Sequence, residues 1–479
     1  MNYLEILGTY KDEMLETLKE TVSINSVQSA PVRTVNGEFY PFGRGVQKAL
    51  EHMLEVGEGM GFRTANIDNY GGHIEWKADS EECPKAETFG IACHLDVVPE
   101  GTGWSTDPFC PVVKDGVIYG RGVSDDKGPL VASLYAMKAV KEAGFKPKKN
   151  IRLILGCDEE TGCSGMDRYT EAAGQPDLGI TPDGEFPLIH GEMGILYFDI
   201  AMKLTKSSLK EGLRLTKFEA GTAPNAVPAT ARAVVASSEP KLYDSIRDRA
   251  AQYSLETGFT VKTKKQGSSM VIESFGTAAH GAHPELGINA ISIMMDFLAR
   301  INFRNEELND YIAFYNEFIG FNLHGESIGC DLQDEPSGRL IWNVGMASFS
   351  EEMASVTVNV RYPVTCTGED VYKGIESSIT DGRIGIIKQM HDAPIYLPLD
   401  NPMVETLMDA YIKETGDTEN KAMVIGGGTY AKHLNNTLAF GGLFPGEPDT
   451  MHQADERMAL DSFYKMARIY AAAIVNICC

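Results

Sequence analysis

A histidine and an aspartate lie two residues apart at the end of an apolar run, in IACHLDVVPEGTGW, residues 91–104. Side chains at positions i and i+2 of a strand lie on the same face, so the Asp96 carboxylate can accept a hydrogen bond from one ring nitrogen of His94. The second ring nitrogen then remains available to bind a metal ion. A polar strand end without a ligand is the alternative, and this pair alone does not decide between them.

Two further segments carry adjacent carboxylates. Asp125 and Asp126 lie in GRGVSDDKGPL, directly before a helical pattern, and Glu159 and Glu160 lie in CDEETGCSG, directly after an apolar run. A helix N-cap accounts for one aspartate, because Asp is favoured there, but it explains the pair less well. Neighbouring carboxylates repel each other, and such pairs often divide into a base and a ligand. A solvated turn is the alternative for the glutamate pair.

Two more candidate ligands lie in turn-like segments, Asp183 in TPDGEFP and His452 in PDTMHQADE. Histidine nitrogens and carboxylate oxygens suit zinc, which takes about four ligands, and sulfur-rich structural zinc patterns are missing from the sequence. The set can hold two ions if one aspartate bridges them and a water completes the shell. Cobalt and manganese bind the same nitrogen and oxygen donors. Cys93 should face away from His94, as a buried strand thiol.

The elements around these motifs predict a sheet covered by helices. FGIACHLDVV and NIRLILGCDEE are short apolar runs, and between them apolar residues recur at helical spacing from Leu130 to Val140, before a stop at Gly144. Strand, helix and strand with such buried runs favour an α/β fold with a parallel or mixed sheet. Ligands gather at the carboxyl ends of strands in such sheets, where His94 and Asp96 are expected to lie.

The sequence pattern changes after Asp183. Residues 190–395 contain alternating strands such as ASVTVNVRYPV and a long helix expected at about 289–303, which predicts an α+β domain. From about residue 400, helical patterns resume. We therefore expect a discontinuous first domain, residues 1–189 and 396–479, with residues 190–395 inserted, although sequence order alone does not prove the insertion.

Composition and segment patterns argue against several classes of function. The chain has 479 residues, 43% of them hydrophobic, and a formal net charge of −24, which disfavours nucleic acid as a partner. No apolar run reaches the roughly 18 residues of a membrane span, and the N-terminal segment lacks the pattern of a signal peptide. Nine cysteines without framework spacing predict reduced thiols in a cytoplasmic protein. The C-terminal Cys-Cys allows lipidation, but a packed helix end explains it better.

Taken together, the motifs resemble those of the M20 family of metallopeptidases, and within it the bacterial PepV-type dipeptidases that include the carnosinase-like enzymes. The combination is specific, although no single segment is. The segments run through nearly the whole chain in family order: HLDVVPEGTGW, GRGVSDDKGP, CDEETGCSG, TPDGEFP, GTAAHGAHPELGINA, VNVRYPV, IGGGTYAKH and FPGEPDTMHQADE.

The resemblance implies two zinc ions and assigns protein ligands to each of them. His94, Asp125 and Asp183 would bind one ion. Glu160, Asp125 and His452 would bind the other, so Asp125 would bridge the two, and a shared water would complete both shells. The family pattern also implies a cis peptide bond after Asp125.

Catalytic roles follow from the same resemblance. Asp96 would steady His94, and Glu159 would be the general base that takes a proton from a water whose pKa two zinc ions lower toward about 7. His280 in GTAAHGAHPELGINA would stabilise the negative oxygen of the tetrahedral intermediate. A loop histidine without a catalytic role is the alternative for His280, and His283 does not fit the motif position.

Three substrate-binding residues are expected in or next to the inserted domain. Arg361 alternates with valines in ASVTVNVRYPV, so it should face away from a valine-lined core, toward solvent or a cleft. The family uses this arginine to bind a substrate carboxylate. Asn225 in GTAPNAVPA matches a residue that contacts substrate near the reacting carbonyl. Backbone amides around Gly427 could approach an anion, with a mobile glycine loop as the alternative.

These inferences predict a metal-dependent dipeptidase that cleaves short peptides with a free N-terminus. An N-acyl amino acid or succinyl-diaminopimelate deacylase of the same fold is the alternative, which the metal motifs do not separate. A non-catalytic zinc-binding module is a third possibility, against which Glu159 and His280 argue. The large insert predicts a lid over small peptide substrates. In the enzymes that the chain resembles, an enlarged lid supplies contacts that other members of the family obtain by dimerising, so the resemblance favours a monomer over a dimer. No membrane partner is expected.

Overall fold

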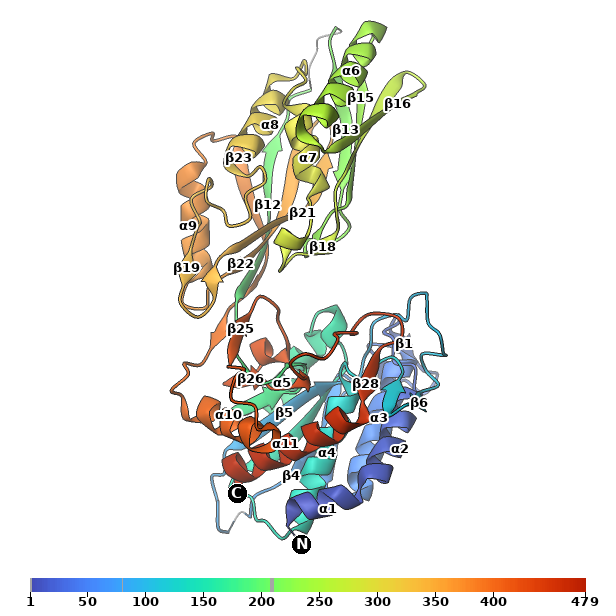
Figure 1. The fold of residues 1–479 in the computed structure, drawn as a ribbon, viewed down its shortest axis with the longest axis vertical. Helices are drawn as coiled ribbons and strands as arrows, with labels where there is room; N and C mark the ends of the chain where they lie inside the picture. The colour runs from blue at the N-terminus through green and yellow to red at the C-terminus, as the bar shows by residue number, and fades with distance from the viewer. Residues whose placement is uncertain (1, 80, 207–210) are drawn as a thin grey trace. The chain divides into compact units, whose positions relative to one another are not determined.

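The structure is a computed structural model that describes residues 2–79, 81–206 and 211–479 (Figure 1). The chain divides into two compact units: Met1–Gly191, Tyr396–Val424 and Gly428–Cys479 form the first, and Glu192–Ile395 with Ile425–Gly427 form the second. A mixed sheet between helices builds the first unit, and an antiparallel sheet with helices builds the second. The expected fold class is confirmed. The functional roles of the two parts, a catalytic domain and a lid, stay predictions.

The first unit is organised by a nine-stranded sheet with the order β24-β11-β26-β9-β5-β8-β4-β3, in which β25 also pairs with β11. Strands β8, β5, β9 and β26 run parallel, whereas β3, β4 and β11 are antiparallel to their neighbours. The strands are β3 (Arg63–Ile67), β4 (Gly71–Trp76), β5 (Thr88–His94), β8 (Asn150–Gly156), β9 (Leu178–Thr181), β11 (Ile189–Glu192), β24 (Ile395–Tyr396), β25 (Met423–Ile425) and β26 (Thr437–Ala439).

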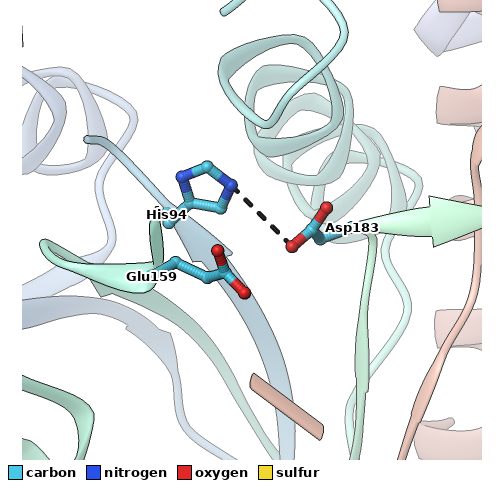
Figure 2. Close-up of side chains that lie close together, drawn as sticks. All are labelled: His94, Glu159 and Asp183. Carbon is cyan, nitrogen blue, oxygen red and sulfur yellow. Dashed lines mark ion pairs between the residues drawn. The ribbon is translucent and has the colours of Figure 1, made fainter. Parts of the chain in front are cut away.

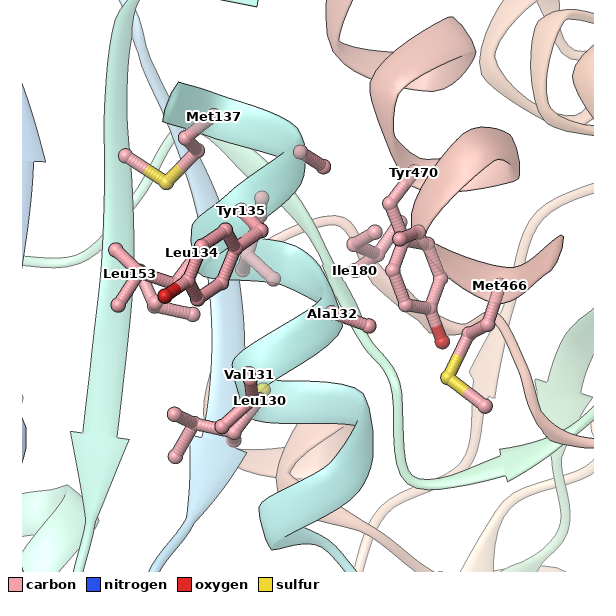
Figure 3. Close-up of a cluster of buried hydrophobic side chains, with 14 of the residues drawn as sticks. Leu130, Val131, Ala132, Leu134, Tyr135, Met137, Leu153, Ile180, Met466 and Tyr470 are labelled. Atoms are coloured by element: carbon pink, nitrogen blue, oxygen red, sulfur yellow. The ribbon is translucent and has the colours of Figure 1, made fainter. Parts of the chain in front are cut away.

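Two apolar clusters lie on opposite faces of this sheet, because residues alternate along β5. Cys93 packs in the larger cluster with α4 and α11, part of which Figure 3 shows, while Ala92 packs in a smaller cluster with Tyr430. His94 therefore lies on the face of Ala92, and Cys93 on the other, as predicted. The helices are α1 (Tyr3–Thr9), α2 (Lys11–Val22), α3 (Arg44–Gly59), α4 (Lys127–Glu142), α5 (Ser164–Ala173), α10 (Pro402–Thr415) and α11 (Leu460–Cys478).

A small three-stranded sheet joins distant parts of the sequence within the first unit. Its strands are β6 (Val112–Lys114), β7 (Val117–Tyr119) and β28 (Arg457–Ala459). Arg457 pairs with Tyr119, so the segment that ends at Glu456 lies beside the segment that begins at Gly120. These two segments carry His452 and Asp125, two of the predicted metal ligands.

The second unit is built on an antiparallel sheet with the order β16-β17-β15-β13-β21-β22-β12-β23. Val356, Val358 and Val360 of β22 are fully buried in its core, as the alternation predicted. The strands are β12 (Gly194–Lys203), β13 (Arg214–Ala220), β15 (Thr230–Ala236), β16 (Thr260–Gln266), β17 (Ser269–Phe275), β21 (Ile341–Phe349), β22 (Met353–Tyr362) and β23 (Ile384–Asp392), and the helices are α6 (Pro240–Thr257), α7 (Ala290–Leu298), α8 (Glu306–Phe318) and α9 (Gly368–Ser378).

The helix expected at about residues 289–303 is shorter than predicted. It is α7, which ends at Leu298, because the next residues form tighter turns, with Ile301 N–H donating to the Leu298 carbonyl. Phe303 then forms a β-bridge with Leu213. The short elements are β1 (Val32–Arg33), β2 (Phe39–Tyr40), β10 (Gly184–Glu185), β14 (Ala226–Val227), β18 (Ala279–His280), β19 (Gln333–Asp334), β20 (Gly338–Arg339), β27 (Gly442–Leu443), η1 (Glu159–Thr161), η2 (Pro284–Leu286) and η3 (Tyr430–His433).

Two sequence expectations concern the cysteines and membranes. All nine cysteines are free thiols, and Cys478 is buried at the end of α11, the packed C-terminal helix that the sequence predicted. Within the described residues, every helix is too short or too polar to cross a bilayer.

Candidate metal centre

Three parallel strands deliver candidate ligands to one edge of the first sheet. His94 ends β5 and is opposite Gly156, the last residue of β8, while β9 follows on the other side of β5. Glu159 and Glu160 follow β8, and Asp183 follows β9. The carboxyl ends of parallel strands meet at the same edge, so residues far apart in sequence converge there.

His94 is fully buried and faces several carboxylates. Its Nδ1 lies 2.9 Å from the main-chain oxygen of Asp96, and its Nε2 lies 2.7 Å from Asp125 Oδ1 and 3.8 Å from Asp183 Oδ2. Figure 2 shows the ring beside Asp183 and Glu159. Because a carbonyl oxygen only accepts, Nδ1 carries a hydrogen, and Nε2 is the nitrogen directed at the carboxylates, as in a metal-ligating histidine.

Asp125 faces two different groups with its two oxygens. Oδ1 lies 2.7 Å from Nε2 of His94, and Oδ2 lies 3.0 Å from Nε2 of His452, which is also 3.0 Å from Glu160 Oε2. Ligand atoms of His94, Asp125 and Glu160 all lie within 4.8 Å of one another, and so do those of His94, Glu159 and Asp183. This arrangement is typical of a carboxylate that bridges two cations.

The cluster carries more negative charge than its own histidines balance. Hydrogen bonds to Asp125 and Glu160 raise the pKa of His452 to about 10. Burial disfavours a charged His94, but the hydrogen bond and charge of Asp125 raise its pKa well above the usual value. Burial, together with Asp183 and other nearby carboxylates, raises the pKa of Glu159 well above its usual range. These shifts indicate that the site stabilises positive charge strongly.

The donor set fits divalent metal ions. It offers two imidazole nitrogens and carboxylate oxygens at mutual distances that suit zinc, and a bound cation would replace the protons that the cluster otherwise attracts. Oε1 of Glu160 is buried and has no hydrogen-bond partner among the described residues. An unpaired buried carboxylate oxygen is costly, and a cation would satisfy it.

Asp96 holds a different part of the site than expected. Its carboxylate Oδ1 is 3.6 Å from His94 Nδ1, and its main-chain carbonyl, not the carboxylate, accepts the hydrogen bond from the ring. The carboxylate instead accepts from the backbone N–H of Glu159 at 3.2 Å and of Glu160 at 3.1 Å. Because these two donors follow the neighbouring strand, Asp96 orients the loop that carries the glutamate pair.

Glu456 is a residue of the site that the sequence reasoning missed. Its Oε1 accepts from the backbone N–H of Ser124 at 2.8 Å and of Asp125 at 3.3 Å, and its Oε2 accepts from Gly122 N–H at 2.9 Å and Arg121 Nη1 at 2.8 Å. It is fully buried. Glu456 is the last residue of the acidic motif that also contains His452. The motif gave no sign that this acid, among several, is the one that faces inward. The expected cis bond between Asp125 and Asp126 is confirmed.

The remaining predicted residues lie together in the second unit. Ala226, next to Asn225, pairs with His280 between β14 and β18, and Gly281 N–H donates to the Asn225 carbonyl at 2.7 Å. Arg361 Nη1 donates to the Gly426 carbonyl at 2.9 Å, beside Gly427. The structure therefore gathers the predicted residues into one group in each unit.

Arg361 is buried without a carboxylate partner. Its exposed fraction is 4%, and it forms no ion pair with any described residue, whereas the buried Arg121 pairs with Glu456 at 2.8 Å. Burial lowers the pKa of the Arg361 guanidinium. A buried guanidinium without an ion-pair partner is costly, so this position favours an anionic ligand.

Comparison with known proteins identifies the family of the chain. The model of peptidase family M20/M25/M40 matches residues 90–476. A Staphylococcus epidermidis protein named "Putative dipeptidase" is 35% identical over 98% of both chains, and "Putative dipeptidase YtjP" of Bacillus subtilis is 33% identical over 98% of this chain and 97% of its own.

Solved structures show the same fold. Human carnosine dipeptidase 1 aligns with a TM-score of 0.51 at 17% identity, covering 99% of this chain and 98% of its own. Aminopeptidase PepT from Bacillus cereus aligns with a TM-score of 0.56 at 14% identity, covering 97% of this chain and 98% of its own. Since the family model matches most of the chain and the relatives match its full length, this protein belongs to the M20 family of metallopeptidases.

Proposed function

We propose that this metallopeptidase is a dipeptidase that uses two divalent cations, with zinc as the expected metal and cobalt or manganese as metals that suit the same donors. The two oxygens of Asp125 carry the proposal, because they face separate histidines, His94 and His452. His94, Asp125 and Asp183 would hold one cation, and Glu160, Asp125 and His452 the other. Relatives named as dipeptidases support peptides as the substrate class.

Bound cations in such a site polarise an amide carbonyl and bring the pKa of water close to neutral. Glu159 is the proposed general base. It is half-buried, its backbone is held by Asp96, and its carboxylate lies among the ligand atoms of His94 and Asp183. A base in this position takes a proton from the attacking water and returns it to the leaving amine.

Recognition of the substrate is assigned to residues of the second unit. Arg361 supplies a buried guanidinium that forms no ion pair with any described residue, which suits the free C-terminal carboxylate of a dipeptide. We assign His280 to the negative oxygen of the tetrahedral intermediate and Asn225 to the region of the reacting carbonyl. The backbone around Gly427 is a further candidate contact for the substrate, and this unit is the proposed lid.

The test is a substrate panel with purified protein. We expect hydrolysis of dipeptides with a free N-terminus, its loss after treatment with chelator, and its return when zinc, cobalt or manganese is added. N-acyl amino acids and N-succinyl-diaminopimelate form the second arm. Preference for these compounds would replace the dipeptidase assignment with a deacylase, and activity that survives complete metal removal would refute the metal-dependent mechanism.

A further inference from the structure

A row of buried polar side chains lies beside the core of the second unit, on strands β21 and β22. Asn359 is fully buried, Asn343 is 2% exposed and Arg361 is 4% exposed. Asn359 and Arg361 are two residues apart on β22, and Asn343 is the direct cross-strand partner of Asn359. Directly opposed residues on one face of a sheet have neighbouring side chains, so the two amides lie side by side.

Hydrogen bonds fix the orientation of both amides. Nε of Arg361 donates to Asn359 Oδ1 at 3.3 Å, and since the guanidinium only donates, Asn359 must present its oxygen there. Nδ2 of Asn343 donates to the carbonyl oxygens of Pro224 at 2.9 Å and Ala226 at 3.0 Å. These carbonyls only accept, so Asn343 must present its nitrogen to them.

These orientations of the two amides leave one donor nitrogen and one acceptor oxygen to be accounted for. Nδ2 of Asn359 and Oδ1 of Asn343 are both buried, and neither has a hydrogen-bond partner among the described residues. An unpaired buried polar atom is unfavourable, and these two atoms are complementary. Asn343 and Asn359 are paired across β21 and β22. A small rotation of the two side chains, or one bridging water, would therefore join these two atoms in a hydrogen bond.

The row connects the groups that the proposed function assigns to substrate. Pro224 and Ala226 flank Asn225, and Ala226 pairs with His280. At the other end, Arg361 donates to the carbonyl of Gly426. The backbone at Gly345 of β21 passes close to Pro224, since a Cβ added at Gly345 would lie 2.1 Å from the Pro224 carbonyl oxygen. This close approach keeps the Pro224 segment beside the middle of the row.

We propose that Asn343 and Asn359 are positioning residues. Their side-chain amides form a hydrogen-bonded relay that holds the Arg361 guanidinium in a fixed position relative to the Asn225 segment. In the relay, Asn359 Nδ2 donates to Asn343 Oδ1, directly or through one water. The consequence for specificity rests on the proposed dipeptidase function. A neutral amide orients the guanidinium and leaves its charge for the substrate carboxylate, whereas a carboxylate at position 359 would pair with the arginine and compete.

The kinetic test compares a dipeptide with the same dipeptide as its C-terminal amide. For Asn359→Asp and Asn359→Leu, we expect KM for the dipeptide to rise about tenfold to a hundredfold, the range of one charge-assisted hydrogen bond, with a much smaller change for the amide. Thr357→Val is the matched control, since Thr357 lies on the same face and bonds to Asp199 instead. Equal changes for both substrates, or the same pattern in the control, would overturn the assignment.

A double variant tests the relay as a unit. If Asn343→Leu and Asn359→Leu break the same connection, the double variant should lose little more dipeptide selectivity than the stronger single variant. Additive losses would show that the two asparagines act independently. Circular dichroism and the thermal midpoint of each variant separate this effect from misfolding.

A crystal structure tests the relay without any substrate. In the wild-type protein, Asn359 Nδ2 should lie within hydrogen-bond distance of Asn343 Oδ1 or of a water that both share, and in Asn359→Leu the guanidinium of Arg361 should rotate. If the two amides bond to unrelated partners, the relay does not exist. If the wild type hydrolyses no dipeptide, the proposed function fails, and this structural arm still decides the relay.

Discussion

Nε2 of His452 lies 3.0 Å from Oδ2 of Asp125, although the two residues come from distant parts of the chain. The pairing of β28 with β7 brings their segments together. His452 has a φ of 60°, in the left-handed region that non-glycine residues rarely adopt. Such a conformation persists where surrounding contacts hold it, and at functional sites it often serves to aim a side chain.

Removal of Asp125 and of His452 should affect metal binding to different extents. Asp125 faces both candidate cation positions, so Asp125→Asn should abolish both, whereas His452→Ala should abolish one and leave the position beside His94. Metal content per protein after dialysis against zinc, measured by atomic emission, checks this. The control is His433→Asn, which removes a histidine paired with Asp167 at 3.0 Å. Equal loss in the two site variants would contradict a bridging Asp125.

Substitution of Glu159 should separate catalysis from metal binding. A general base contributes about 10²–10⁴-fold to the rate, so Glu159→Gln should reduce kcat by that factor with two ions still bound. Stopped assays with saturating dipeptide and metal analysis of the same sample check both parts. Glu159 lies within reach of His94 and Asp183, so loss of a metal ion in this variant would show that it is a ligand and not the base.

Glu456 should support the metal centre through the Asp125 loop. Its carboxylate accepts hydrogen bonds from three backbone N–H groups of that loop, so Glu456→Gln should weaken metal affinity about 10–100-fold, the usual effect of losing a residue that orients ligands. A competition titration with a chromophoric chelator measures this without an activity assay. Glu75→Gln is the matched control, because Glu75 is also buried and paired with an arginine, at 2.9 Å from Arg152. An equal effect in both variants would indicate general destabilisation.

His73 should make the folded state sensitive to acid. Burial lowers its pKa from 6.5 to about 4 in the folded protein, where its Nδ1 lies 2.9 Å from the Tyr169 hydroxyl. Between these values the unfolded chain binds a proton that the folded histidine does not, so stability rises from pH 4 to pH 6.5 and is lost as the pH falls.

Urea unfolding midpoints at pH 7.5 and pH 4.5, measured with chelator present so that metal loss does not contribute, check this dependence. His73→Gln should show a smaller fall than the wild type. His283→Gln, at an exposed histidine, should behave like the wild type. If His73→Gln falls as steeply as the wild type, the acid sensitivity arises elsewhere.

Local periodicity predicted much of what positions the site. The apolar run before His94 predicted a buried strand. The alternation in β22 predicted that Arg361 and Val360 lie on opposite faces of the strand, because neighbouring side chains of a strand alternate between its faces. The end of α7 was predicted five residues too late. The apolar Ile301 comes three residues after Leu298, at helical spacing, but it belongs to a turn, and Phe303 forms a β-bridge.

The sequence by itself determined which residue types stand at strand ends and on which face they lie, because these properties depend on neighbours a few positions away. It did not determine which atoms meet. The Asp96 carboxylate bonds to the backbone of Glu159 rather than to His94 because β8 pairs with β5, and Glu456 reaches the Asp125 loop because β28 pairs with β7. Pairing between distant strands decides such contacts, and only the tertiary structure contains it.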